Sequence, residues 1–252
     1  MRTYILLFLL LASPAFAGED GTLSLSPAVV MLRGDHGQST TQTLTMVNGT
    51  SRAFSFDLVA QDVVTTDGTR TFVEAGSIAG SIAATAVFSP NRVTVPPGQT
   101  VAVTITVTLP PQTPQRAIIA LFRGTNTVMS GKVPMTASLG ALLTFTVSDS
   151  VELDAAPLAV RAQSATANLG VTHACRNAGR EPLVAKGVMA VIDARGALVG
   201  KSPLTSKRLL PGESADFGGE YGGELDPGRY RVFVTYDYEG KTLTRDAEVV
   251  IP

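Results

Sequence analysis

Residues 88–110 read FSPNRVTVPPGQTVAVTITVTLP, and the second part of this stretch alternates with a period of two. From Val101 to Leu109 every odd position is apolar, whereas threonine occupies three of the four even positions. Successive side chains of a β-strand point to opposite faces, so the pattern predicts a strand with an apolar core face and a threonine face toward water. The segment Pro96–Gly98 predicts a turn before this strand, and Pro110 ends it, because proline has no amide for a sheet ladder.

The composition of the whole chain agrees with a β-protein. The 252 residues include 24 glycines and 15 prolines, no tryptophan, and abundant valine and threonine. Short alternating segments recur along the chain and are separated by turn residues such as Asn48-Gly49, which predicts a tight hairpin. We therefore expect an all-β fold of two tandem immunoglobulin-like β-sandwiches that follow a cleaved signal peptide.

The N-terminal residues 1–17, MRTYILLFLLLASPAFA, predict that signal peptide. One basic residue precedes an apolar run, and Ala15 and Ala17 form an Ala-x-Ala cleavage site before Gly18. A membrane anchor is the alternative, but the apolar run is too short to cross about 30 Å of hydrocarbon. We expect a periplasmic or otherwise secreted protein that has no membrane span in its mature form.

Cleavage leaves residues 18–148 as a first domain, residues 149–156 as a linker, and residues 157–252 as a second domain. The linker is rich in acidic side chains, which are interpreted as a solvated connection, with a cation site between the domains as the alternative. Related phrases, Pro97-Gly98-Gln99 and Pro211-Gly212-Glu213, precede strands in both halves. They suggest related domains, although turn chemistry alone could produce them.

The predicted strands of the first half are Leu23–Leu32, Gln42–Val47, Phe54–Val64, Thr69–Val73, Val101–Leu109, Arg116–Arg123 and Val133–Val147, with a long loop from Glu74 to Ala86. Those of the second half are Ala159–Ala162, Ala167–Ala174, Leu183–Asp193, Leu198–Val199, Arg208–Leu210, Ser214–Phe217, Tyr230–Tyr238 and Thr242–Ile251.

Charge and motif content exclude several functions. Removal of residues 1–17 leaves 19 basic and 21 acidic side chains, a net charge of −2, so there is no electrostatic reason to expect nucleic acid as a partner. No nucleophile elbow, phosphate-binding loop or paired zinc motif occurs. His173 and Cys175 would lie on the same face of a strand and could form half a metal site. We interpret them as ordinary strand residues with Cys175 buried, and expect no catalysis, metal or cofactor.

The segment Val133–Leu143 is the candidate binding element. It follows a loose loop, Gly124–Lys132, and combines alternating apolar residues with small neighbours. Such a strand at a sheet edge could pair with a strand of another protein. The alternative is that it is a covered structural strand.

The strand order, the motif Pro90-x-x-Val93-x-Val95-x-Pro97-Gly98-Gln99 and the late segment VPMTASLGALLTFTVS resemble the periplasmic pilus-assembly chaperones of the PapD-like superfamily. The resemblance implies that the edge strand after the variable loop completes a pilin sandwich, through donor side chains that match Val133, Met135, Ala137 and Leu139. The family also anchors a terminal carboxylate with an Arg and a Lys. The nearest equivalents here are Val29 and Thr144, which cannot pair with a carboxylate, so the chain departs from the family at this point.

These inferences predict a non-enzymatic, chaperone-like protein that binds secreted, β-rich, pilin-like subunits by strand addition. A structural or adhesive surface module that binds cell-wall or surface components is the alternative. The pattern is also similar to two-domain surface proteins of Gram-positive bacteria. Those proteins usually end in a membrane helix, which is not expected here.

Overall fold

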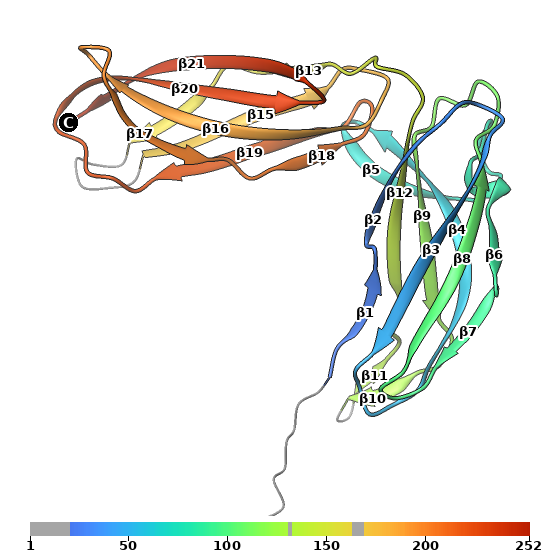
Figure 1. The fold of residues 1–252 in the computed structure, drawn as a ribbon. Coiled ribbons are helices and arrows are strands. Elements are labelled where there is room, and N and C mark those ends of the chain that lie inside the picture. Colours follow the sequence, from blue (N-terminus) through green and yellow to red (C-terminus); the bar gives the residue numbers. More distant parts are fainter. Residues whose placement is uncertain (1–20, 131–132, 163–168) are drawn as a thin grey trace, which may run out of the picture.

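A computed structural model describes residues 21–130, 133–162 and 169–252, and the expected signal peptide lies outside these residues. Figure 1 shows two β-sandwiches arranged as the arms of an L, with the second sandwich extending from one end of the first. Each sandwich has its own buried apolar core. The expected all-β class with two tandem immunoglobulin-like sandwiches is confirmed.

The first sandwich consists of two sheets and a small hairpin. One sheet has the order β1-β3-β8-β6, the other has the order β2-β12-β9-β4-β5 with β7 also paired to β4, and β10 pairs with β11. The strands are β1 (Leu23–Ser26), β2 (Val29–Arg33), β3 (Ser39–Asn48), β4 (Phe54–Thr66), β5 (Thr69–Glu74), β6 (Val87–Ser89), β7 (Arg92–Val95), β8 (Thr100–Thr108), β9 (Ala117–Gly124), β10 (Val128–Ser130), β11 (Val133–Met135) and β12 (Leu139–Thr146).

The second sandwich repeats this organisation. Strand β15 pairs with β13, β14 and β19 in one sheet, and the other sheet has the order β17-β16-β20-β21 with β18 also paired to β16. The strands are β13 (Leu153–Ala155), β14 (Ala159–Ala162), β15 (Leu169–Asn177), β16 (Leu183–Asp193), β17 (Leu198–Pro203), β18 (Lys207–Leu209), β19 (Ser214–Tyr221), β20 (Gly228–Tyr238) and β21 (Lys241–Ile251).

The alternating stretch has the expected orientation in β8. Val103, Ile105 and Val107 are buried in the first core, whereas Thr104 and Thr106 point to the other face. That face continues onto β3, where the hydroxyl of Thr41 bonds that of Thr106 at 2.8 Å. Cross-strand threonine pairs of this kind stabilise a solvated sheet face.

The first predicted strand, Leu23–Leu32, divides in two at Pro27. Its first half, β1, runs antiparallel to β3 in one sheet, and its second half, β2, runs parallel to β12 in the opposite sheet. Proline cannot donate to a ladder, so the chain leaves one sheet at this point and joins the other. The expected edge or bulge at Pro27 is therefore a change of sheet.

The hairpin predicted at Asn48-Gly49 is wrong, because β3 and β4 belong to different sheets. Asn48 is buried, its amide donates to the backbone oxygens of Arg52 and Val95, and its Oδ1 accepts the N–H of Thr50. The buried side-chain amide of Asn48 thus has its hydrogen bonds satisfied by the backbone. This corner between two sheets takes the place of the expected Asn-Gly hairpin turn.

The same corner occurs in the second sandwich around Asn177. Its amide donates to the backbone oxygens of Glu181 and Leu209, and its Oδ1 accepts the N–H of Gly179. The backbone N–H of each asparagine donates to the residue after the Pro-Gly turn, which is Gln99 in one sandwich and Glu213 in the other. The repeated Pro-Gly phrases thus mark equivalent corners of the two sandwiches.

The segment predicted as a long loop, Glu74–Ala86, is tied to the first sandwich. The buried carboxylate of Asp62 accepts the N–H groups of Ile82 and Ala83 and the hydroxyl of Ser81. A short 3-10 helix, η1 (Ala83–Thr85), follows. These bonds compensate the carboxylate for the loss of water.

Candidate functional site

Strand β12 lies between β9 and β2, but its two neighbours cover different lengths of it. The antiparallel ladder with β9 runs from Leu139 to Thr144, whereas the parallel ladder with β2 begins only at Leu142, opposite Val29. Because β1 pairs with β3 in the other sheet, residues 139–141 have a hydrogen-bonded ladder partner on one side only among the described residues. We call this stretch the β12 gap.

The backbone of Gly140 points into the β12 gap. The N–H of Leu142 donates to the carbonyl of Ala28 on the β2 side at 2.9 Å, and the N–H of Phe145 donates to Arg116 on the β9 side at 2.8 Å. Backbone groups alternate in direction along a strand, so the N–H and C=O of Gly140 face the same side as those of Leu142. This is the unpaired backbone that strand addition requires.

The strand predicted over Val133–Val147 is not continuous. Val133 and Met135 lie in β11, which pairs with β10, and residues 136–138 separate this hairpin from β12. Pro134 cannot donate to a ladder. The N–H of Gly124 donates to the hydroxyl of Ser138 instead of to a backbone carbonyl, so regular strand pairing is interrupted between β11 and β12.

The four candidate donor residues therefore lie in two places. Ala137 and Leu139 are partly buried against the first core, next to the β12 gap. Val133 and Met135 are in the hairpin. In the described structure, Ala137 and Leu139 thus fill their own sandwich.

The outer face of the sheet beside the β12 gap is apolar. Val30 points into the core, so Val29 and Met31 point outward, and they are 44% and 65% exposed. The register places Val29 beside Leu142 and Met31 beside Thr144. The two expected anchor equivalents, Val29 and Thr144, are therefore diagonal neighbours. The hydroxyl of Thr144 donates to the carbonyl of Val30 at 3.2 Å.

An open hollow of about 420 Å³ lies between Met31 and the second sandwich. Its far wall contains two cations and two anions: Lys186, Arg208, Asp237 and Glu239. Burial lowers the pKa of Arg208, and the nearby guanidinium of Arg70 lowers it further. Arg70 itself lies 2.8 Å from a carboxylate oxygen of Glu213 and donates to the carbonyl of Arg208.

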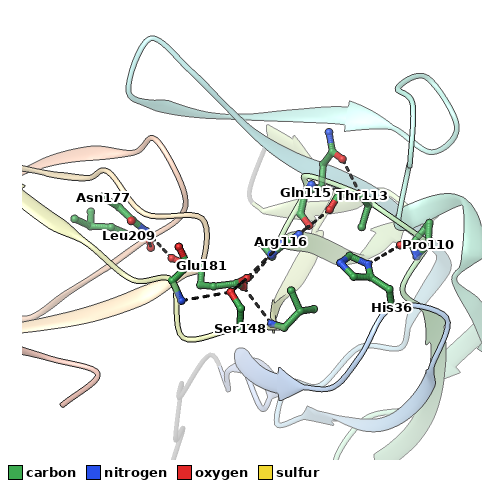
Figure 2. A network of polar contacts seen from close by, with 11 residues as sticks. His36, Pro110, Thr113, Gln115, Arg116, Ser148, Asn177, Glu181 and Leu209 are labelled. Carbon is green, nitrogen blue, oxygen red and sulfur yellow. Dashed lines mark hydrogen bonds and ion pairs between the residues drawn. The ribbon is translucent and has the colours of Figure 1, made fainter. Parts of the chain in front are cut away.

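The corner of the L is held by a buried ion pair between Arg116 and Glu181 (Figure 2). The Nε of Arg116 donates to Oε2 of Glu181 at 2.9 Å, and Nη2 reaches Oε1 at 3.3 Å. The carboxylate also accepts the N–H of Val147 and the hydroxyl of Ser148. With four donors around a carboxylate that has no exposed surface, the pair meets the condition under which a buried charge is tolerated.

The other half of the ion pair is equally well bonded. Nη1 of Arg116 donates to the carbonyls of Thr113 and Gln115 at 2.7 and 2.9 Å. Beside it, Leu210 of the second sandwich packs with Val63 and Ala117 of the first. Polar and apolar contacts therefore both fix the second sandwich at this end of the first.

No sequence pattern marks Arg116 and Glu181 as functional residues. They are 65 positions apart, and each lies in a connecting segment without a motif. One local signal exists for Glu181, which lies four residues after Asn177. The buried side-chain amide of Asn177 donates to the backbone carbonyl of Glu181.

His173 and Cys175 lie on the same buried face of β15, as expected. The Nε2 of His173 donates to the carbonyl of Ala156 at 2.7 Å, and its Nδ1 accepts the hydroxyl of Tyr236 at 2.9 Å. Burial lowers the pKa of His173 and raises the pKa of Cys175 and of Tyr236. Both ring nitrogens are thus used in structural hydrogen bonds.

The other candidate groups of the sequence are accounted for as follows. His36 is exposed and its Nδ1 donates to the carbonyl of Pro110 at 2.8 Å. In the linker, Asp149 pairs with Arg33. Within the described part of the chain, no three His, Cys, Asp or Glu side chains come together as metal ligands. A helix with the length and apolar character to cross a membrane is likewise absent from residues 21–130, 133–162 and 169–252.

Comparison with known proteins gives a partial family match and fold neighbours. A family model described as an Fn3-like domain matches residues 31–147. No curated protein sequence matches the chain.

Similar solved structures include the class 5 fimbriae chaperone CfaA, with 13% identity, coverage of 92% of this chain and 99% of that chain, and a TM-score of 0.49. The CsuC–CsuE chaperone–tip subunit complex of Acinetobacter baumannii has 9% identity, coverage of 90% and 98%, and a TM-score of 0.45. The chaperone DraB of E. coli has 16% identity, coverage of 91% and 98%, and a TM-score of 0.44. Pilus chaperones are thus among the solved structures that this chain resembles.

Removal of the Glu181 carboxylate should strongly destabilise the protein. In a Glu181→Ala variant the Arg116 guanidinium stays buried without its counter-ion, and breaking such a pair costs about 3–5 kcal/mol of unfolding free energy. Urea unfolding measures the loss. Asp149→Ala, which removes the exposed pair with Arg33, is the matched control and should leave the midpoint unchanged. Equal effects of the two substitutions would contradict a structural role of the buried pair.

Stability should fall when the pH drops below the normal range of histidine. The pKa of His173 is depressed in the folded state, so the unfolded chain takes up the proton first. The contribution of the neutral ring is complete above about pH 6.5 and is lost as the pH falls through the folded pKa. Urea midpoints between pH 7.5 and 5 should show a slope that His173→Gln removes and His36→Gln retains. A slope that persists in His173→Gln would assign it to other groups.

Proposed function

We propose that this chain is a non-enzymatic, chaperone-like protein of the periplasm that binds secreted, β-rich, pilin-like subunits by strand addition along Val133–Leu143. The observation that carries the proposal is the β12 gap, where Gly140 presents an unpaired N–H and C=O at the edge of the six-stranded sheet. An extended segment of a partner can supply the missing ladder, and the neighbouring side chains can select it.

The β12 gap differs from the longest open edge of the second sandwich. Among the described strands β21 pairs with β20 alone, yet Arg245 in its middle lies opposite the buried Val234 and so faces the core side. An inward-pointing charge is a common device against unwanted pairing at an edge. Residues 139–141, Leu-Gly-Ala, contain no charge or proline. The β12 gap is therefore the less protected of the two edges.

Because the donor segment lies in two parts, strand addition along Val133–Leu143 requires a rearrangement on binding. The β10–β11 hairpin keeps Val133 and Met135 apart from β12. If residues 133–141 became one continuous strand, the alternating side chains Val133, Met135, Ala137 and Leu139 would share one face. Release of the short hairpin, which has three residue pairs, is the conformational cost of this step.

The adhesive module remains the second candidate. The outer face of β3 and β8 is an array of hydroxyl groups, and some of them bond one another, as in the pairs Ser39–Thr108 and Thr41–Thr106. A wall or surface component would bind this face without using the β12 gap. The two candidates therefore predict contacts on different sheets.

The strand-addition proposal predicts that Gly140→Pro abolishes partner capture, because proline removes the amide that faces the β12 gap. A photo-crosslinking amino acid at the exposed Thr136 should trap a small secreted β-rich protein in the native host, identified by mass spectrometry. Gly140→Ala is the matched control. It adds the same Cβ, which meets the Cδ1 and Cγ1 side-chain atoms of Ile119 at 2.6 and 3.0 Å, but it keeps the N–H.

We expect capture by the parent protein and by Gly140→Ala, with loss in a folded Gly140→Pro variant. Capture that survives in Gly140→Pro would contradict strand addition. Crosslinks to wall or surface components from a probe at Thr43, with none from Thr136, would favour the adhesive module instead.

A further inference from the structure

The apolar face beside the β12 gap ends at the hollow between the sandwiches. Met31 of β2 lines the hollow, and Val29 precedes it on the same outward face. Leu142 and Ile119 continue this face across β12 and β9, because the register aligns Val29, Leu142 and Ile119 in one row. Leu142 and Ile119 are partly buried against the Leu210 contact at the corner. We call Val29, Met31, Ile119 and Leu142 the apolar step.

A strand that pairs with Gly140 cannot continue past the apolar step. From Leu142 onward the same edge of β12 is occupied by β2, and the N–H of Leu142 is already bonded to Ala28. An added strand must therefore end or turn at Val29. Its last side chains then lie over Val29 and Met31, which are the exposed members of the step.

The charges around this end point do not favour an anion. The apolar step itself has no charged side chain, and the nearest first-sandwich cations are engaged, Arg33 with Asp149 and Arg116 with Glu181. On the far wall of the hollow, Lys186 and Arg208 are balanced by Asp237 and Glu239, since two positive and two negative charges sum to zero. Lys186 and Asp237 are also direct cross-strand neighbours.

We propose that the apolar step receives an aliphatic side chain at the end of the partner's added strand, and that a terminal carboxylate is not needed there. This inference rests on the proposed strand addition and specifies its partner: a β-rich subunit whose bound segment ends in an aliphatic residue. A carboxylate moved from water onto this wall would lose hydration without gaining a cation, whereas an aliphatic group loses only unfavourable contact with water.

The test uses a synthetic nine-residue peptide of alternating threonine and valine that ends in leucine, labelled with fluorescein at its N-terminus. It is prepared as the free acid and as the C-terminal amide, and its affinity for the full mature chain is measured by fluorescence anisotropy. We expect the two forms to bind within about twofold of each other, and both to lose affinity in Gly140→Pro. Met31→Glu should weaken both by about tenfold or more, which is 1.4 kcal/mol of binding free energy.

Two matched controls separate the apolar step from general effects of a new charge. Val250→Glu places the same charge on an outward side chain of β21 that is 64% exposed, against 65% for Met31, and should leave the affinity unchanged. Met31→Leu exchanges one apolar side chain for another and should lose much less affinity than Met31→Glu.

The possible failures are distinguishable. If the free acid binds about tenfold more tightly than the amide and Arg208→Ala removes this preference, the terminal group is an anion held by the second sandwich, and the inference about the apolar step is overturned while strand addition stands. If neither peptide binds, or if binding is the same in Gly140→Pro, strand addition itself is overturned, and the inference with it.

Discussion

The change of sheet at Pro27 is the constraint on which the rest of the structure depends. The chain leaves β3 at Pro27 and joins β12, so one short segment supplies an edge strand to each sheet of the first sandwich. The same step leaves part of β12 without a neighbour, because β2 reaches only Leu142. The first sandwich thus has a complete core but an incomplete hydrogen-bond ladder along β12. Unpaired backbone groups of this kind favour aggregation unless a specific partner strand pairs with them.

The buried ion pair of Arg116 and Glu181 determines which part of the second sandwich lies near this unpaired part of β12. It fixes the second sandwich at the end of the six-stranded sheet, so Met31 on the outer face of β2 becomes one wall of a hollow. The Asn177 corner places Glu181 by bonding its carbonyl. A local asparagine motif, repeated from the first sandwich, is in this way part of the contact that orients the two sandwiches.

Much of the fold could be predicted from local patterns. The period of two identified β8, and Leu183–Asp193 was predicted with the bounds of β16, because alternation and turn residues act within a few positions. The Asn48 corner and the break in β1–β2 could not be predicted, since both depend on which sheet the next strand joins. Glu181 was missed for the same reason: its partner is distant in sequence. The donor residues Val133, Met135, Ala137 and Leu139 remain a prediction, because the alternation of a segment does not say which side of its strand is left unpaired.

Strand addition requires that the backbone of Gly140 lies open at the edge of the six-stranded sheet. Amide hydrogen exchange of the mature chain, read residue by residue by NMR, tests it directly, because exchange reports whether an N–H is held in a ladder. We expect Leu142, bonded to Ala28, to be protected and Gly140 to exchange faster by about a hundredfold or more. Equal protection of the two amides would mean that the edge is already paired and that no strand can be added at Gly140.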